Sequence, residues 1–198
     1  MRIDLELIAE TIPKGARVLD LGCGSGELLA HLRDHHGTVG LGVEIETDRI
    51  LDCIKQGVPV VQKDLDTGLG NFLDHSFDIV VMSQSLQQMK APHRTLAEML
   101  RIGREAIVTI PNFGFWNARR YLTFLGRMPM SKLLPYGWYD TPNIHMCTLR
   151  DFEDLCREQN VRIKQRTVVD SQHRSRKLIN LMPNFLGEVA IYHIENNA

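Results

Sequence analysis

The chain has 198 residues, of which 43% are hydrophobic and 24% charged, an ordinary globular composition that excludes disordered and fibrous classes. Lys plus Arg number 23 and Asp plus Glu number 24, so the formal net charge is only −1. That balance supplies no overall field to attract nucleic acid or an anionic membrane, and the length favours a single domain spanning residues 1–198.

The N-terminus and the cysteines indicate the compartment. No apolar stretch approaches the roughly 18 residues of a membrane-spanning helix. The first six residues carry acids where a signal peptide would carry a basic and then an apolar run, so we expect a cytoplasmic protein. The cysteines are widely spaced and form no Cys-x-x-Cys pair, which favours reduced thiols and no metal site: Cys23, Cys53, Cys147 and Cys156.

Short apolar runs alternate with helical patterns over the first 110 residues. The runs predict strands at residues 17–21, 39–45, 58–61, 77–82 and 105–110. Helices are predicted at residues 27–34 and 47–56, and around Leu96, Met99 and Leu100. Strands that are apolar on both faces and separated by helices are typical of a parallel sheet covered on both sides. We therefore expect a doubly wound, Rossmann-like α/β fold whose ligand crevice lies at the carboxyl ends of the strands.

The last third of the chain has a different pattern. Residues 113–147 are aromatic, contain prolines and look loop-like, so we expect a lid or docking insertion there. Thr148 is a predicted helix N-cap with Asp151 at the third helical position. The helix that follows has an apolar stripe at Leu149, Phe152, Leu155 and Cys156. Residues 161–169 and 189–194 predict two final strands, as an antiparallel hairpin at the edge of the sheet.

A glycine-rich turn between the first strand and the first helix of this pattern is the strongest local motif. Its glycines permit positive φ and close approach of a ligand to the backbone, and the helix beyond offers free N–H groups. A dinucleotide fingerprint has the spacing G-x-G-x-x-G. Here the glycines stand at positions 22, 24 and 26, and Glu27 would oppose a pyrophosphate. The turn therefore does not fit NAD.

Residues 20–26, Asp-Leu-Gly-Cys-Gly-Ser-Gly, resemble the D-x-G-x-G-x-G motif of class I S-adenosylmethionine (SAM)-dependent methyltransferases. The resemblance implies a Rossmann-like methyltransferase fold and SAM or S-adenosylhomocysteine as cofactor. It places Glu44 on the ribose hydroxyls, Asp64 and Leu65 at the adenine, and Ser83 near the sulfonium. The implied binding residues are Asp20, Gly22, Cys23, Gly24, Gly26, Glu44, Asp64, Leu65 and Ser83.

Longer stretches resemble the MetW family of methionine-biosynthesis proteins, at residues 18–26, 110–116, 126–129, 134–145 and 148–152. This resemblance implies a SAM-fold partner subunit of the homoserine O-acyltransferase MetX, in a heteromeric complex that supports acylation of homoserine. Two alternatives remain open. One is a catalytically active methyltransferase that acts on a small molecule, and the weaker one is a nucleic-acid methyltransferase.

The sequence identifies no catalytic residue. The Asn/Asp-Pro-Pro-aromatic motif of many amino-methylating enzymes is missing after the fourth strand, where Ser83-Gln84-Ser85-Leu86-Gln87-Gln88 stands instead. Candidate bases are His93, Tyr139 and His145, and each also has an ordinary structural interpretation. The G-x-S-x-G motif would need glycine at position 23. Any acyl chemistry is therefore assigned to the partner.

Two surface features bear on partners. The segment from Phe113 to Tyr139 is rich in aromatic and arginine residues, which are enriched at interface hot spots, although a substrate lid or a packed cover explains it equally. The second feature is a basic cluster, interpreted first as a solvated edge, then as a surface for an acidic partner, and last as an RNA site. It consists of Arg162, Lys164, Arg166, Arg174, Arg176 and Lys177.

Overall fold

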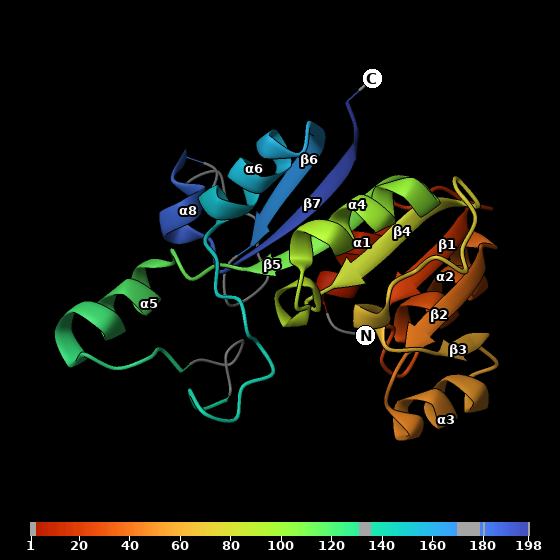
Figure 1. The fold of residues 1–198 in the computed structure, drawn as a ribbon, viewed down its shortest axis with the longest axis horizontal. Helices are drawn as coiled ribbons and strands as arrows, with labels where there is room; N and C mark the ends of the chain where they lie inside the picture. Colours follow the sequence, from red (N-terminus) through yellow and green to blue (C-terminus); the bar gives the residue numbers. More distant parts are fainter. Residues whose placement is uncertain (1–2, 131–135, 170–178, 180, 198) are drawn as a thin grey trace.

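A computed structural model describes residues 3–130, 136–169, 179 and 181–197. Within them, seven strands form one sheet in the order β3-β2-β1-β4-β5-β7-β6 (Figure 1). Strands β1 to β5 run parallel, and β7 is antiparallel to both β5 and β6. The predicted α/β fold with an antiparallel edge hairpin is confirmed. The strands are β1 Arg17–Leu21, β2 Val39–Glu44, β3 Val60–Gln62, β4 Phe77–Ser83, β5 Gly103–Pro111, β6 Val161–Val169 and β7 Val189–Asn196.

The third strand begins two residues later than predicted. The backbone N–H of Val58 donates to the carbonyl of Cys53 (2.9 Å), so Val58 still closes the preceding helix. Pro59 has no N–H to donate to a strand ladder, although its carbonyl accepts from Gly42 (2.9 Å). Regular pairing with β2 therefore starts at Val60.

Helices lie between most successive strands, as the alternating pattern predicts, although only a 3₁₀ turn lies between β3 and β4. The principal ones are α1 Ile3–Thr11, α2 Glu27–His36, α3 Thr47–Lys55, α4 Pro92–Ile102, α5 Trp116–Arg120, α6 Leu149–Glu158 and α8 Pro183–Leu186. The described residues also form the 3₁₀ turns η1 Leu65–Thr67 and η2 Leu86–Gln88, and the π-helical turn η3 Tyr121–Leu125. Among the described helices, none is long and apolar enough to cross a bilayer.

Two helical elements differ from expectation. Helix α1 was not predicted, and its residues Leu5, Ile8 and Ala9 are buried against one face of the sheet. Helix α5 and the π turn interrupt a segment expected to be loop-like, and both stand apart from the sheet in Figure 1. Residues 115–125 contain neither glycine nor proline, so nothing in this stretch prevents helical turns.

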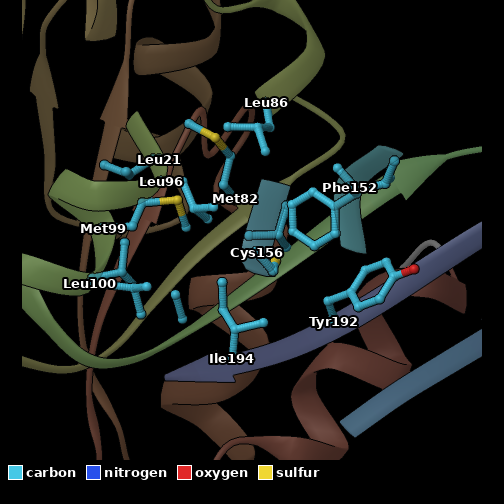
Figure 2. Close-up of a cluster of buried hydrophobic side chains, with 14 of the residues drawn as sticks. Leu21, Met82, Leu86, Leu96, Met99, Leu100, Phe152, Cys156, Tyr192 and Ile194 are labelled. Carbon is cyan, nitrogen blue, oxygen red and sulfur yellow. The ribbon is translucent and has the colours of Figure 1, made fainter. Parts of the chain in front are cut away.

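Both faces of the sheet are covered by apolar clusters. Ile79 and Val81 of β4 belong to one cluster with α1 and α2, whereas Val80 and Met82 belong to the other with α4 and α6. Figure 2 shows part of the second cluster. Burying a whole aliphatic or aromatic side chain contributes about 1.5–3 kcal/mol. Because both faces of the sheet are covered, the central parallel strands carry apolar residues on both faces.

Helix α6 begins as predicted. The Thr148 side chain accepts from the Asp151 N–H, and the Asp151 carboxylate accepts from the Thr148 N–H (2.7 Å), which together form a capping box. Phe152 on the buried face of α6 meets the Tyr192 ring of β7 with centroids 4.7 Å apart. The cap therefore fixes where α6 starts, and the aromatic contact fixes how it lies on the edge hairpin.

Candidate cofactor site

The glycine-rich turn leaves β1 in a left-handed backbone conformation. The φ angles are 75° at Gly22, 55° at Gly24 and 80° at Gly26. The N–H groups of Gly22 and Cys23 both donate to the carbonyl of Val43, at 2.8 and 3.1 Å, which ties the turn to the end of β2. Alternate glycines are needed because residues with a Cβ rarely adopt such φ values.

The three glycines of the turn have different surroundings. A Cβ on Gly24 would meet nothing within 4 Å, so this position is open toward the crevice. A Cβ on Gly26 would lie 3.0 Å from the Cys53 sulfur, and one on Gly22 would lie 2.8 Å from the Ser85 hydroxyl. Gly24 therefore provides open space, whereas Gly22 and Gly26 also permit close packing.

A cavity of about 380 Å³ lies at the carboxyl ends of β1, β2 and β3, in the size range of small-molecule sites. It brings together five of the residues that the sequence predicts as binding residues: Gly22, Gly24, Glu44, Asp64 and Leu65. Its wall also contains the charged side chains of Glu46, Arg49 and Lys63, which the sequence did not indicate. The lining therefore mixes acids and bases.

The buried carboxylate of Glu44 organises this cavity. One of its oxygens accepts the Gly24 N–H (2.8 Å), and the other accepts the N–H groups of Ile45 (2.7 Å) and Glu46 (3.1 Å). A carboxylate has about four acceptor positions. Glu44 is therefore held rigidly and keeps about one position for a ligand hydroxyl, rather than accepting freely from two.

Asp64 also lines the cavity. It caps η1 by accepting the Asp66 N–H (2.9 Å), and it is exposed to solvent. The neighbouring Lys63 N–H donates to the Glu44 carbonyl (2.9 Å), so the end of β3 is fixed against the end of β2. This bond sets the spacing between the two carboxylates.

Four predicted binding residues do not line the cavity: Asp20, Cys23, Gly26 and Ser83. Asp20 is buried within β1. Burial first, and then the charge of Asp20, raise the pKa of the Cys23 thiol, whose sulfur lies 3.9 Å from that of Cys53. The Ser83 hydroxyl accepts from Thr109 (3.3 Å), and Ser85, two residues on, lines the cavity instead.

Sequence reasoning missed Gln84, which adopts a left-handed backbone (φ 55°) directly after β4. Its N–H donates to the Thr109 hydroxyl (2.7 Å), and its amide nitrogen donates to Asp4 of α1 (2.8 Å). Such strain in a non-glycine residue costs about 1–3 kcal/mol and is concentrated at functional sites. The run of polar residues from Ser83 to Gln88, directly after the fourth strand, was the sequence pattern that could have pointed to Gln84.

The candidate bases lie elsewhere. His93, Tyr139 and His145 are all exposed, and none of them lines the cofactor cavity. Within the described residues, no group of three His, Cys, Asp or Glu side chains could hold a metal ion. The cavity thus offers groups for binding and orienting a ligand, and none of the three candidate bases is placed to take a proton there.

The described part of the basic cluster is neutralised by ion pairs. Arg162 pairs with Glu195, Lys164 with Glu105 and Glu195, and Arg166 with Glu153. Arg174, Arg176 and Lys177 lie outside the described residues. The three described cations therefore form ion pairs along the edge hairpin, as a solvated edge does.

Comparison with protein families gives one match over nearly the whole chain. The family described as "Methionine biosynthesis protein MetW" matches residues 2–194. A curated relative from Rhodopirellula baltica, the "Bifunctional methionine biosynthesis protein MetXA/MetW", is 36% identical over 207 residues. The match covers 99% of this chain but 33% of the relative, so the chain spans about a third of that protein.

A second curated relative is more distant. The "Ubiquinone biosynthesis O-methyltransferase" of Coxiella burnetii is 28% identical over 136 residues. The match covers 64% of this chain and 56% of the relative, so it too reaches only part of each protein.

Solved structures share the fold. A SAM-dependent methyltransferase from Archaeoglobus fulgidus superposes with a TM-score of 0.71 at 17% identity, covering 98% of this chain and 92% of that one. A second from Mesorhizobium loti gives 0.67 at 17% identity, with 97% and 95% covered. The [4+2]-cyclase SpnF gives 0.68 at 17% identity, with 98% and 80% covered. Because this fold carries both methyltransferases and a cyclase, it does not fix the reaction.

Proposed function

Because the chain belongs to the MetW family of methionine-biosynthesis proteins, we propose that it is a SAM-binding partner subunit of homoserine O-acyltransferase. The observation that carries this proposal is the Rhodopirellula baltica relative, whose name joins MetXA and MetW in one bifunctional protein. Fusion keeps two modules at a high effective concentration, which benefits modules that work together. The family resemblance identifies the MetX part as the acyltransferase.

The cofactor cavity supports SAM or S-adenosylhomocysteine as the ligand. Gly24 offers backbone without a Cβ facing the cavity, and the fixed Glu44 carboxylate keeps an acceptor position for a ribose hydroxyl. Asp64 and the Leu65 N–H would receive the adenine edge. When bound, SAM supplies an activated methyl group. The residues of this chain bind and orient it, and transfer needs little more than alignment with a nucleophile.

Cofactor binding is tested by thermal unfolding with S-adenosylhomocysteine. A ligand present at 100 times its dissociation constant adds about 2.7 kcal/mol, or about 5–10 °C in Tm for a chain of this size. We expect a rise of that order with S-adenosylhomocysteine and none with NAD. An unchanged Tm at saturating S-adenosylhomocysteine would contradict cofactor binding.

The segment at residues 113–147 supplies the proposed docking surface. In its described part, Phe124 is 79% exposed, and Trp138 and Tyr139 are exposed to a similar extent. The Arg120 guanidinium lies 5.6 Å from the centre of the Trp116 ring. Exposed aromatic and arginine side chains gathered in one segment are typical of a protein interface. Helix α5 and η3 carry part of this segment away from the sheet (Figure 1).

The partnership is tested by mixing the chain with the homoserine O-acyltransferase of the same organism. Size-exclusion chromatography with light scattering should give one species whose mass exceeds that of either protein. Two separate peaks at micromolar concentrations of both proteins would contradict a stable complex.

The second candidate function is a free-standing methyltransferase. The Coxiella burnetii relative favours it, because that protein is named as an O-methyltransferase. The two functions are distinguished by incubating the chain with SAM and a panel of small hydroxylated and amino compounds. Production of S-adenosylhomocysteine dependent on one compound would favour the methyltransferase.

A further inference from the structure

A second cavity, of about 310 Å³, lies beside the cofactor cavity. The short turn η2 contributes to both: Gln88 lines the cofactor cavity, whereas Leu86 and Gln87 line the second one. Ile110 from the end of β5 and Phe152 from α6 also line the second cavity, whose wall is mainly apolar. Figure 2 shows Leu86 and Phe152 at the upper margin of the core cluster.

One buried polar atom in this wall has no partner. Gln87 is only 6% exposed; its amide nitrogen donates to the Gln84 carbonyl (2.7 Å), and its backbone carbonyl accepts from Ile144 (3.1 Å) and His145 (2.9 Å). Its side-chain oxygen Oε1 is buried without a hydrogen bond from any residue that the structure describes. Leaving a buried acceptor unsatisfied costs about 1–3 kcal/mol, which a ligand's donor would recover.

Two titratable side chains of the wall, His145 and Asp151, are exposed, so they lie toward solvent and not in the apolar interior. The Asp151 carboxylate lies in the wall, but it accepts both the N–H (2.7 Å) and the hydroxyl (2.9 Å) of Thr148 in the α6 cap. Burial raises the pKa of the Cys147 thiol to about 11, so this group is protonated and neutral at pH 7. A charged group placed in the apolar interior, among Leu86, Ile110 and Phe152, would lose its hydration, so an uncharged ligand is favoured.

We propose that this cavity is a second small-molecule site, which takes an uncharged, mostly apolar molecule with one hydrogen-bond donor for Gln87 Oε1. The site is separate from the cofactor cavity and does not depend on the acyltransferase partner. The exposed side chains of Ile144 and Met146 lie at its mouth, where a ligand would enter. The chemistry of the wall thus selects a hydroxyl or an N–H on a small hydrocarbon body.

The test uses indole, which has an N–H, and N-methylindole, which has nearly the same shape and no donor. Each is titrated into the full chain while the methyl NMR signals of Ile110 and Ile144 are followed. Indole should shift both signals saturably and bind about 3- to 10-fold more tightly than N-methylindole, the ratio expected for one hydrogen bond. No saturable shift with indole, or equal affinities for the two probes, would overturn the proposal.

Two variants test whether Gln87 causes the preference for indole over N-methylindole. Gln87→Met removes the acceptor and should bring the two affinities to within twofold of each other. Gln88→Met is the matched control, because Gln88 also donates to the Gln84 carbonyl (3.3 Å) but lines the cofactor cavity instead, so the indole preference should persist. If Gln87→Met does not fold, Ile144→Trp at the exposed mouth should weaken indole binding severalfold. An unchanged preference in Gln87→Met, or unchanged binding in Ile144→Trp, would overturn the site.

Discussion

At the level of single residues, Glu44 connects the sequence motif to the cavity. Its carboxylate accepts three backbone N–H groups from two different segments, the glycine turn and the start of the loop after β2. Hydrogen bonds to a charged group contribute about 1.5–3 kcal/mol each. The same carboxylate therefore shapes the site and presents an acceptor to a ligand.

We expect Glu44→Gln to weaken S-adenosylhomocysteine binding by about 10- to 100-fold, because an amide has one oxygen where the carboxylate has two. The measurement is isothermal titration calorimetry. The control is Glu10→Gln, which removes the same charge from an exposed position on α1. Equal affinities of Glu44→Gln and the unmodified chain would show that Glu44 does not contact the ligand.

Gly24 and Gly26 give a second residue-scale prediction. Alanine at either position has to adopt a left-handed backbone, at a cost of about 1–2 kcal/mol. At Gly26 the added methyl also lies 3.0 Å from the Cys53 sulfur, so its total cost should reach about 2–4 kcal/mol. Gly24→Ala should be the milder change for stability and the stronger one for ligand affinity.

Urea unfolding and calorimetry of the two alanine variants separate these effects. The expected order is a larger loss of stability for Gly26→Ala and a larger loss of affinity for Gly24→Ala. The reverse order in affinity would mean that Gly24 does not face the ligand.

At the level of elements, the N-terminus of α6 depends on a local signal. Thr148→Ala removes the side chain that accepts the Asp151 N–H and should cost about 1 kcal/mol. Thr148→Ser keeps the acceptor and should cost much less. Chemical denaturation of both variants is the measurement, and an equal loss in the two would mean that the hydroxyl is not the stabilising group.

Helix α4 carries the pH-dependent contact. Arg101 donates to the carboxylates of Glu98 (2.8 Å) and Asp74 (2.5 Å) and to the carbonyls of Leu69 and Phe72. The hydrogen bond from Arg101 lowers the pKa of Glu98. A carboxyl whose pKa is lower in the folded state stabilises the fold above its unfolded-state pKa, and this stabilisation is lost as the pH falls through the folded-state value.

Glu98→Gln should therefore lower the free energy of unfolding at pH 7 by about 0.5–1 kcal/mol, the range of a partly exposed ion pair. The difference in unfolding free energy between the variant and the unmodified chain should shrink below about pH 4.3, the ordinary pKa of glutamate. Urea unfolding at pH 7 and pH 3 is the measurement. A difference that grows on acidification would contradict this sign.

Sequence patterns predicted the strands well, because a parallel strand is buried on both faces and its apolar run is short and continuous. Helix α1 escaped prediction because Leu5, Leu7 and Ile8 are spread around the helix, so the sequence shows no single apolar stripe. Tertiary contacts hold it, including the bond between Asp4 and Gln84. Strand ends also located Glu44 and Asp64, whereas Ser85, Arg49 and Lys63 depend on loop paths that no spacing specifies.

At the scale of the whole molecule, exposed apolar side chains distinguish a docking surface from an ordinary one. Phe124 on η3 is 79% exposed, and Leu73 before β4 is 78% exposed. Only the first lies within the aromatic and arginine-rich segment. Phe124→Ser should weaken the complex with the acyltransferase at least about tenfold, as the loss of an aromatic anchor does, while leaving Tm unchanged.

Leu73→Ser is the matched control and should leave the complex intact. Surface plasmon resonance with immobilised acyltransferase measures both variants. Equal affinities for Phe124→Ser and the unmodified chain would move the docking surface away from this segment.

The partner role itself is tested most directly by the rate of homoserine acylation. The homoserine O-acyltransferase of the same organism is assayed at a fixed concentration while this chain is titrated in. The account predicts a rate that rises and then saturates as the complex forms, and SAM then becomes the next variable to add. A rate that stays flat across the titration, with no complex formed, would contradict the proposed partnership.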